Sequence, residues 1–356
     1  MARTYRIAVI GGDGIGPEVT DAALSVLDAA EARFGFKTER TPFDWSALGY
    51  TKGLHVTAEM IEPLKKYDAV LLGAIGHPDA PRGLPEMDIV FGLRRGLDLF
   101  VNLRPLVLYD ERLCPLKGRT AADVDMVVVR ENTEDVYGVP GRTEGAGGPD
   151  ETVATEMRFT RRGTERITRY AFELARSRPR KRLTMVDKAN AIRIQDLHRR
   201  VFEDVAKDFP DVERDAMYVD AASMWMVLHP ERFDVIVTTN LFGDILSDLG
   251  AAICGGLGSG ASGNIHPGRV SVFEPIHGSA PKHAGKNTAC PLGAVLAVSM
   301  MLDHLGETKA AEKLERAVAE VIAEGKDVTY DFKADRNDPT AVGTQEMAEA
   351  ICKKMK

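Results

Sequence analysis

The regular alternation of two kinds of segment along the chain is the strongest constraint on its fold. Short runs rich in β-branched residues include RIAVI (6–10), DMVVVREN (125–132) and FDVIVTTN (233–240). Between such runs lie longer segments with apolar residues at helical spacing, for example EVTDAALSVLDAAEARF (18–34). This alternation predicts an α/β protein with a largely parallel sheet and functional residues at the strand ends.

Length and charge limit the classes of function. A chain of 356 residues is longer than one small core requires, so we expect two compact lobes or one large α/β domain. The net charge of -7 argues against nucleic acid or an anionic membrane as the main partner. The four cysteines lie far apart and no segment is as long as a signal peptide or a membrane span, so we expect a reduced cytoplasmic protein.

A pair of aspartates in the apolar segment NLFGDILSDL (240–249) predicts a cation site. Asp244 and Asp248 are four residues apart and therefore share one helical face, where like charges repel. Asp220 ends the run RDAMYVDAA, and we expect it at a strand end. Three carboxylates without a Cys or His cluster favour Mg²⁺ or Mn²⁺, although the pair could instead form salt bridges or helix caps.

Cationic and proton-transferring candidates follow other predicted strands. Arg94, Arg104 and Arg130 are candidates for carboxylate recognition, and Arg130 closes a run of apolar residues, where we expect its guanidinium to emerge at a strand end. Tyr137 and Lys188 follow two successive strands and are candidates for an acid and a base. Surface arginines, and structural roles for Tyr137 and Lys188, are the alternatives.

Three segments interrupt the alternation. The loops GGDGIGPE (11–18) and HGSAPKHAGK (277–286) are glycine-rich and precede helices, which is typical of either a phosphate loop or a tight turn. The first loop does not match the dinucleotide-binding pattern G-x-G-x-x-G. Glycines and prolines in residues 137–161 predict a protruding hairpin arm of the kind that clasps a second subunit.

Six motifs occur in the order in which they are found in one enzyme family. They are GDGIGPE, NLRP, VVVRENTE, DKAN, TTNLFGDILSDL and EPIHGSAP. The chain therefore resembles the β-decarboxylating dehydrogenases, which act on isopropylmalate, isocitrate, homoisocitrate, and D-malate or tartrate. The resemblance implies a two-domain fold that is not a Rossmann fold, with the active site in the cleft between the domains.

The resemblance also implies domain boundaries and an oligomer. Residues 1–102 and 255–356 would form a discontinuous first domain with the cofactor loops. Residues 103–254 would form the second domain, with the dimer interface and the arm at about 138–161. A homodimer or a larger homo-oligomer with shared active sites would be the functional unit.

Catalytic and metal-binding roles follow from the resemblance alone. Asp244 and Asp248 of one subunit and Asp220 of the other would bind the divalent cation. Lys188, contributed across the dimer interface, would act as base on the C2 hydroxyl, and Tyr137 would protonate C3 after decarboxylation. A regulatory subunit would lack some of these residues, and all of them are present here.

The resemblance assigns the substrate's malate carboxylates to the three arginines already named. Specificity would lie in the segment MDIVFGLRR, where Val90 and Phe91 offer apolar surface and Asp88 would repel a third carboxylate. We therefore expect 3-isopropylmalate as the substrate, with D-malate or tartrate second, then isocitrate or homoisocitrate. Asp135 departs from the family, which usually has glycine there.

The cofactor prediction depends on residues after HGSAP. NAD enzymes of the family have an aspartate where this chain has Lys282, followed by His283, and the NADP-linked isocitrate enzymes share VTYDF, which includes Tyr330 here. A lysine and a tyrosine can donate to a 2′-phosphate, so we expect NADP in preference to NAD. The other residues implied at the cofactor are Ile15, His277, Gly278, Ser279, Ala280 and Cys290.

Overall fold

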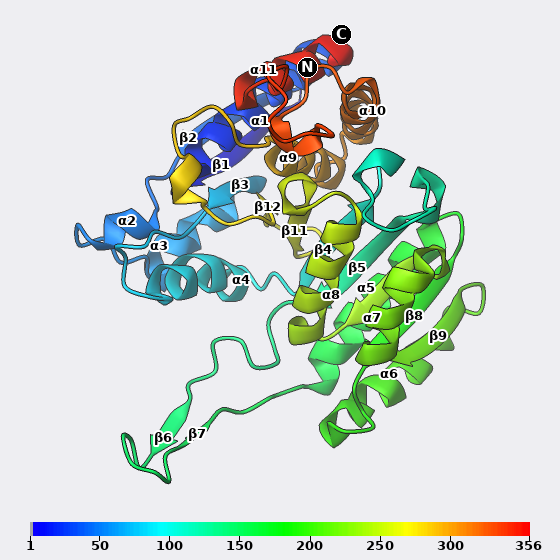
Figure 1. The fold of residues 1–356 in the computed structure, drawn as a ribbon. Helices are drawn as coiled ribbons and strands as arrows, with labels where there is room; N and C mark the ends of the chain where they lie inside the picture. Colours follow the sequence, from blue (N-terminus) through cyan, green and yellow to red (C-terminus); the bar gives the residue numbers. More distant parts are fainter. Residues whose placement is uncertain (1–2) are drawn as a thin grey trace. The chain divides into compact units, whose positions relative to one another are not determined.

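The computed structural model describes residues 3–356, which form two compact units (Figure 1). The first unit contains the described residues through Leu99, together with Leu103–Asp125 and Gly250–Lys356. The second contains Phe100–Asn102 and Met126–Leu249. Residues 103–125, expected in the middle domain, belong to the first unit because β4 (Val101–Val107) pairs with β11 (Ala261–Ile265) of that unit.

The first unit is built on a mixed sheet. Its strand order is β2 (Lys37–Pro42), β1 (Thr4–Gly12), β3 (Ala69–Ala74), β12 (Ser271–Pro275), β11 and β4. The pairs from β2 to β12 are parallel, and β11 is antiparallel to β12. Strand β3 reads AVLLGA and all of it is buried, as expected for a strand covered on both faces.

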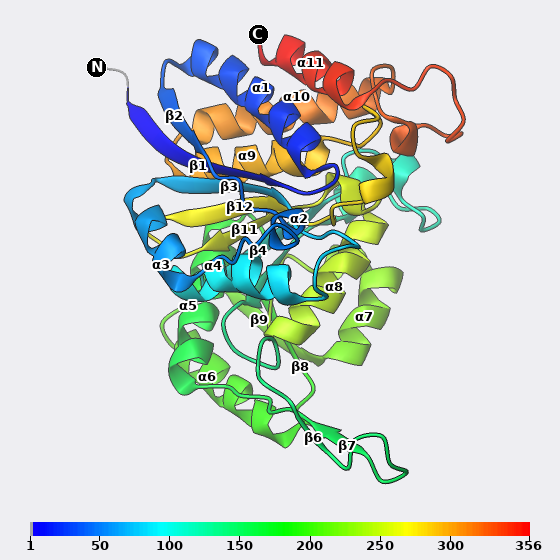
Figure 2. The same ribbon diagram turned by 90° about the vertical axis from the view of Figure 1, so that its left-hand side faces the viewer.

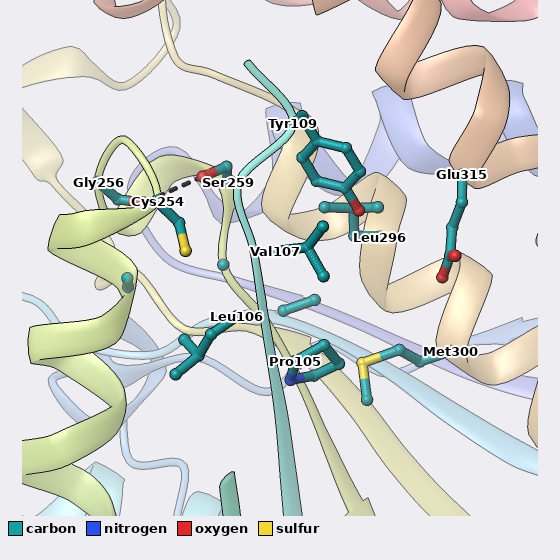
Figure 3. Close-up of a pocket in the computed structure, with 13 residues that line it drawn as sticks. Pro105, Leu106, Val107, Tyr109, Cys254, Gly256, Ser259, Leu296, Met300 and Glu315 are labelled. Atoms are coloured by element: carbon teal, nitrogen blue, oxygen red, sulfur yellow. Dashed lines mark hydrogen bonds between the residues drawn. The ribbon is translucent and has the colours of Figure 1, made fainter. Parts of the chain in front are cut away.

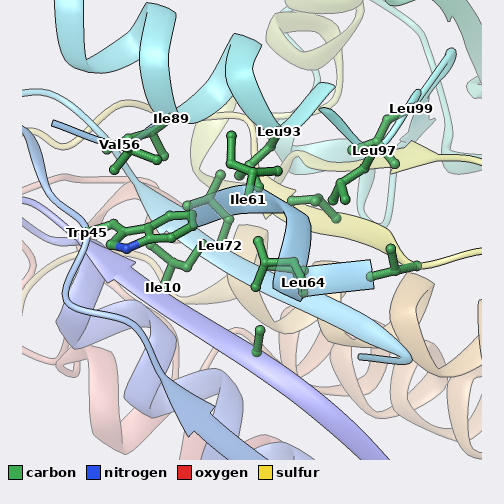
Figure 4. Close-up of a cluster of buried hydrophobic side chains, with 14 of the residues drawn as sticks. Ile10, Trp45, Val56, Ile61, Leu64, Leu72, Ile89, Leu93, Leu97 and Leu99 are labelled. Atoms are coloured by element: carbon green, nitrogen blue, oxygen red, sulfur yellow. The ribbon is translucent and has the colours of Figure 1, made fainter. Parts of the chain in front are cut away.

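Helices cover both faces of this sheet, as Figure 2 shows. One face is covered by α1 (Gly16–Phe34), α9 (Leu292–His304), α10 (Thr308–Glu324) and α11 (Thr344–Met355). On the other face, α2 (Ala47–Tyr50), α3 (Ala58–Ile61) and α4 (Phe91–Gly96) enclose a core cluster. In that cluster Trp45, Ile61, Leu72 and Leu93 pack together (Figure 4).

The second unit has a fully parallel arrangement of strands. Its order is β5 (Asp125–Glu131), β10 (Val235–Thr238), β8 (Arg182–Asp187) and β9 (Glu213–Tyr218). Helices α5 (Arg161–Ser177) and α6 (Asp196–Ala206) lie on one side, with α7 (Val219–Leu228) and the first part of α8 (Asn240–Ile253) on the other (Figure 2). The predicted α/β class is confirmed in both units.

A two-stranded hairpin lies between β5 and α5 in the chain. Its strands β6 (Arg142–Glu144) and β7 (Thr152–Ala154) are antiparallel and mostly exposed. The second strand is short because no apolar layer covers it, and Val153 is 69% exposed. Among residues 3–356, no helix combines the length and the apolar composition needed to cross a membrane.

Candidate active site

The side chain of Arg130 lies against the first turns of α8. Its Nε and Nη2 donate to Oδ1 of Asn240 at 2.9 and 2.7 Å, and its Nη1 pairs with Asp244. A Cβ on Gly243 would lie 2.5 Å from Cγ of Arg130, so glycine is needed here for the arginine side chain to fit along the helix. Arg130 is the next-to-last residue of β5, at the strand end as predicted, but it is 1% exposed, where the sequence predicted an emerging guanidinium.

Tyr137 joins this group from the loop after β5. Its hydroxyl donates to Oδ2 of Asp244 at 2.8 Å, and Cζ of Arg130 lies 5.3 Å from the centre of its ring. Burial, reinforced by the hydrogen bond to Asp244, raises the pKa of Tyr137 to about 12. The phenol therefore keeps its proton at neutral pH and is chemically suited to donate one.

Asp244 and Asp248 lie one turn apart in α8. The Asp244 side chain is 37% exposed and Asp248 is exposed, so both carboxylates are accessible from outside the second unit. Arg130 pairs with Asp244, and its positive charge offsets the repulsion between the two carboxylates.

Lys188 and Asp220 form a second pair in the same unit. Lys188 directly follows β8, and its Nζ lies 2.6 Å from Oδ1 of Asp220. The hydrogen bond from Lys188 lowers the pKa of Asp220. Asp220 lies in the first turn of α7, two residues beyond the strand end where the sequence placed it, because β9 ends at Tyr218.

The turn that carries Lys188 is held by buried polar groups. Its backbone N–H donates to Oε1 of Gln195 at 2.7 Å, and Gln195 is fully buried. The neighbouring Asp187 accepts from the Arg199 guanidinium and from the Ala189 N–H. This arrangement limits the directions in which the lysine side chain can leave the turn.

Three carboxylates of the second unit are of the chemical type that binds a hard divalent cation. Within one chain, the described residues contain no group of three His, Cys, Asp or Glu side chains that could hold a metal. The Asp244–Asp248 pair supplies hard oxygen ligands from one helix face, and Asp220 has a 66% exposed side chain that a neighbouring chain could reach. Their carboxylate oxygens are the type of ligand that Mg²⁺ and Mn²⁺ prefer.

In the first unit, Arg94 lies near the end of the predicted substrate segment and is buried. Its Nη2 lies 3.8 Å from Glu274, and its Cζ is 5.1 Å from the centre of the Phe91 ring. The segment begins as a π-helical turn, Glu86–Val90, in which Val90 is half-buried. Arg104 in β4 is also buried.

Two loops of the predicted cofactor site are in direct contact. The N–H of Ile15 donates to the Ser279 carbonyl at 2.8 Å, and Gly14 has a φ of 59°. A Cβ at Gly14 would lie 1.9 Å from that same carbonyl oxygen, so the close approach requires glycine. Asp13 stabilises the turn by accepting from the N–H groups of Ala47, Leu48 and Gly76.

The VTYDF segment packs beside the second of these loops. A Cβ on Gly258 would lie 3.2 Å from Oδ2 of Asp331 and 3.3 Å from Cβ of Cys290. Burial lowers the pKa of His277 and raises the pKa values of Cys290 and Asp331. The other predicted residues lie on the surface of this region: Gly278 and Ala280 in the loop, exposed Lys282 and His283 in the turn Pro281–His283, and half-buried Tyr330.

Two residues that the sequence did not single out contribute to these sites. Asn240 binds Arg130 through its carbonyl oxygen and donates from Nδ2 to the Glu134 carbonyl at 3.0 Å. Asp13 holds the first loop. Asn240 lies two residues after β10 and Asp13 directly follows β1 in a glycine-rich turn, and this placement of polar residues was the available signal.

A separate cavity of about 100 Å³ lies in the first unit (Figure 3). Its apolar wall includes Leu106, Leu296 and Met300, and Tyr109 and Glu315 add polar groups. Burial raises the pKa of Cys254, which also lines it, to about 12, so this thiol is protonated at neutral pH. None of the predicted site residues lines this cavity.

Comparison with known proteins is consistent with this geometry. Residues 6–351 match the family model described as isocitrate/isopropylmalate dehydrogenase. A 3-isopropylmalate dehydrogenase of Thermobifida fusca (strain YX) is 45% identical over 91% of this chain and 92% of its own length. A decarboxylating D-malate dehydrogenase of Escherichia coli (strain K12) is 42% identical and covers 99% of both chains. The crystal structure of isocitrate dehydrogenase from Methylococcus capsulatus has a TM-score of 0.87 and 37% identity, covering 99% of each chain.

Proposed function

The chain belongs to the isocitrate/isopropylmalate dehydrogenase family, and from this premise we propose that it oxidises and decarboxylates a 3-substituted malate, with 3-isopropylmalate as substrate and NADP as hydride acceptor. It is a decarboxylating dehydrogenase, and the family depends in general on NAD(P) and a metal ion. The observation that carries the proposal is the meeting of Arg130, Tyr137 and Asp244, which combines a carboxylate-binding group, a proton donor and a metal-type ligand.

In the proposed reaction, the aspartates, Lys188 and Tyr137 have separate roles. Asp244 and Asp248, together with Asp220 of the partner subunit, would hold a divalent cation that would supply Lewis acidity, and bound NADP would serve as the hydride acceptor. Lys188 removes the proton of the C2 hydroxyl. Tyr137 gives a proton to C3 once carbon dioxide has left, a role supported by its raised pKa.

The arginines hold the two carboxylates of the malate unit. Arg94 and Arg130 are buried but each already faces an acidic side chain, Glu274 and Asp244 respectively. These carboxylates neutralise the guanidinium groups in the absence of substrate. A planar guanidinium group can bind a carboxylate through two N–H donors, which is why the substrate's carboxylates are assigned to Arg94, Arg104 and Arg130.

For the substituent on C3, the apolar surface of Val90 and Phe91 supports an isopropyl group. Burying such a group is worth about 1 to 3 kcal/mol. Asp88 of the same segment accepts a hydrogen bond from the Tyr50 hydroxyl at 3.1 Å, which keeps an acidic group near this surface. A substrate with a third carboxylate would be repelled there.

D-malate is the second candidate, and one comparison favours it. The Escherichia coli D-malate enzyme matches 99% of this chain, whereas the Thermobifida fusca isopropylmalate enzyme matches 91%. D-malate would leave the surface of Val90 and Phe91 uncovered.

NADP preference is supported by the packing of two distant segments. Asp331 of the VTYDF segment and Cys290 both lie against Gly258, and Lys282 is exposed in the turn Pro281–His283. An exposed lysine and a half-buried Tyr330 can both donate to a 2′-phosphate, while an aspartate at position 282 would repel it.

A homodimer is supported by exposed apolar side chains on the two helices that carry the aspartates. On α7, Met224 is 48% and Leu228 49% exposed, and on α8 Ile245 is 55% exposed. Such a surface is characteristic of a protein interface. The exposed hairpin, including Val153, offers a second contact for the partner.

Comparing substrates with each nicotinamide cofactor tests the proposal. We expect kcat/KM to be highest for 3-isopropylmalate with NADP in a panel that also contains D-malate, tartrate, isocitrate and homoisocitrate. EDTA should abolish turnover, and added Mn²⁺ should restore it. Highest activity with isocitrate would refute the substrate assignment, and full activity in EDTA would refute the metal requirement.

A further inference from the structure

Asp135 has an unusual backbone conformation in a buried place. Its φ is 81°, in the left-handed region that favours glycine, and the residue is only 1% exposed. Four other described non-glycine residues have positive φ, namely Asp98, Lys181, Ala280 and Asn287. A strained, buried and acidic residue needs a compensating interaction.

The carboxylate of Asp135 makes that interaction with the start of α8. Its Oδ2 accepts from the N–H of Leu241 at 2.9 Å. Leu241 is in the first turn of the helix, where the N–H groups have no partner within the helix. A negative charge at this end is also favoured by the helix dipole.

The backbone of Asp135 adds a connection to the base of the hairpin. Its N–H donates to the Arg158 carbonyl at 3.0 Å, forming an isolated bridge between the two segments. Asp135 therefore joins the loop after β5, the base of the hairpin and the start of α8.

Two further hydrogen bonds connect the same loop with the same helix. The Glu134 carbonyl accepts from Nδ2 of Asn240 at 3.0 Å, and the Tyr137 hydroxyl donates to Asp244 at 2.8 Å. In the loop, Asp135 lies between Glu134 and Tyr137. In the helix, its partner Leu241 lies between Asn240 and Asp244. The position of Tyr137 relative to Asp244 thus depends on how this loop is held against the first turn of α8.

We propose that Asp135 is a positioning residue: by binding the Leu241 N–H it sets the distance between the proton donor Tyr137 and the metal-type ligand Asp244. This inference rests on the proposed function for the meaning of those two residues. It assigns a purpose to an acidic residue at a position whose backbone conformation suits glycine, because glycine would relieve the strain but leave the helix start unbound.

Three variants separate positioning from simple stability. Asp135→Gly relieves the strain and removes the acceptor, whereas Asp135→Asn keeps an acceptor on a residue that tolerates positive φ. Lys181→Gly is the matched control, since it relieves strain at a φ of 46° elsewhere in the second unit. Each dimeric variant is titrated with Mn²⁺ alone by calorimetry, assayed for kcat and KM, and followed by amide hydrogen exchange over 240–244.

For Asp135→Gly we expect faster exchange at 240–244, about tenfold weaker Mn²⁺ binding and kcat reduced about tenfold or more, with KM changed less. Asp135→Asn should restore all three to within about threefold of the wild type, because it keeps the acceptor. Lys181→Gly should alter none of them.

The proposal is overturned if Asp135→Gly lowers only the melting temperature, or if Asp135→Asn is as impaired as Asp135→Gly. Failure of the proposed function is a different result: the wild type would then turn over none of the five hydroxy acids. The exchange and Mn²⁺ measurements would still decide whether Asp135 orders this part of α8.

Discussion

At the scale of single residues, Gly243 and Arg130 show how an absent side chain creates a site. The guanidinium reaches Asn240 and Asp244 only because Gly243 leaves a path along α8. The need for glycine here is steric, since the residue is in an ordinary helix and not in a left-handed conformation.

Replacing this glycine should therefore disable the site without touching any charged group. In Gly243→Ala the new Cβ would lie 2.5 Å from Arg130, so the arginine must move. We expect kcat/KM to fall about 100-fold, because small displacements of positioned groups have effects of that size. Steady-state kinetics with the best substrate measures this. A kcat/KM within about twofold of the wild type would show that the helix or the arginine can move without consequence.

A single charge at position 282 should control the choice of cofactor. A charge-assisted contact with a phosphate is worth about 1.5 to 3 kcal/mol, so Lys282→Asp should shift the ratio of kcat/KM values toward NAD by about tenfold or more. Tyr330→Phe is the comparison, and it should have less effect because it removes one neutral donor. A wild-type enzyme that uses NAD as well as NADP would contradict the assignment.

At the scale of secondary-structure elements, helix α6 contains a buried titratable group that the proposed chemistry does not use. His198 is 7% exposed, its ring lies 4.6 Å from the ring of Phe159, and its Nδ1 has no hydrogen-bond partner in the described part of the chain. Burial lowers the pKa of His198 from 6.5 to about 4, so the folded protein keeps this imidazole neutral.

Stability should consequently fall in mild acid. As the pH decreases through 6.5, the unfolded chain takes up a proton at His198 while the folded chain does not, until the pH approaches 4. Between pH 6.5 and pH 4 the free energy of unfolding should fall by about 3 kcal/mol. Above pH 6.5 this stabilisation is fully present. Urea unfolding of wild type and of His198→Gln between pH 8 and 4 measures the difference. Parallel pH profiles for the two proteins would contradict the prediction.

At the scale of the whole molecule, the proposed active site needs two chains. Within one chain Asp220 pairs with Lys188 and Asp244 pairs with Arg130, and the described residues hold no complete set of three metal ligands. Under the proposed function, a second chain would bring the missing carboxylate, and the exposed apolar residues of α7 and α8 are the surface proposed for its contact.

Mixed dimers test this sharing directly. Tyr137→Phe and Lys188→Met should each be nearly inactive alone. When the two variants are unfolded and refolded together, heterodimers should contain one site with both native residues and recover about a quarter of the wild-type activity, given random pairing. Each variant refolded alone is the control. No recovery despite heterodimer formation, verified by mass spectrometry, would show that Tyr137 and Lys188 of the same chain act together.

Much of the fold and the character of the site follow from local sequence. Alternating β-branched and amphipathic runs specify strands and helices because each pattern must bury one apolar face. The spacing of Asp244 and Asp248 places them on one helical face in any α-helix, and Lys188 after an apolar run places it at a strand end. These relations depend only on helix and strand periodicity.

Other features were decided by contacts between residues far apart in the chain. Arg130 is buried against α8 rather than emerging, Asp220 lies in α7 rather than at the strand end, and Asp135 binds the helix 106 residues later. Local sequence patterns do not specify which strand end contacts which helix, because those contacts depend on how whole elements pack. The sequence by itself determined the periodic elements and the kinds of chemical group, whereas only the tertiary structure decided which groups are buried together and which partners they bind.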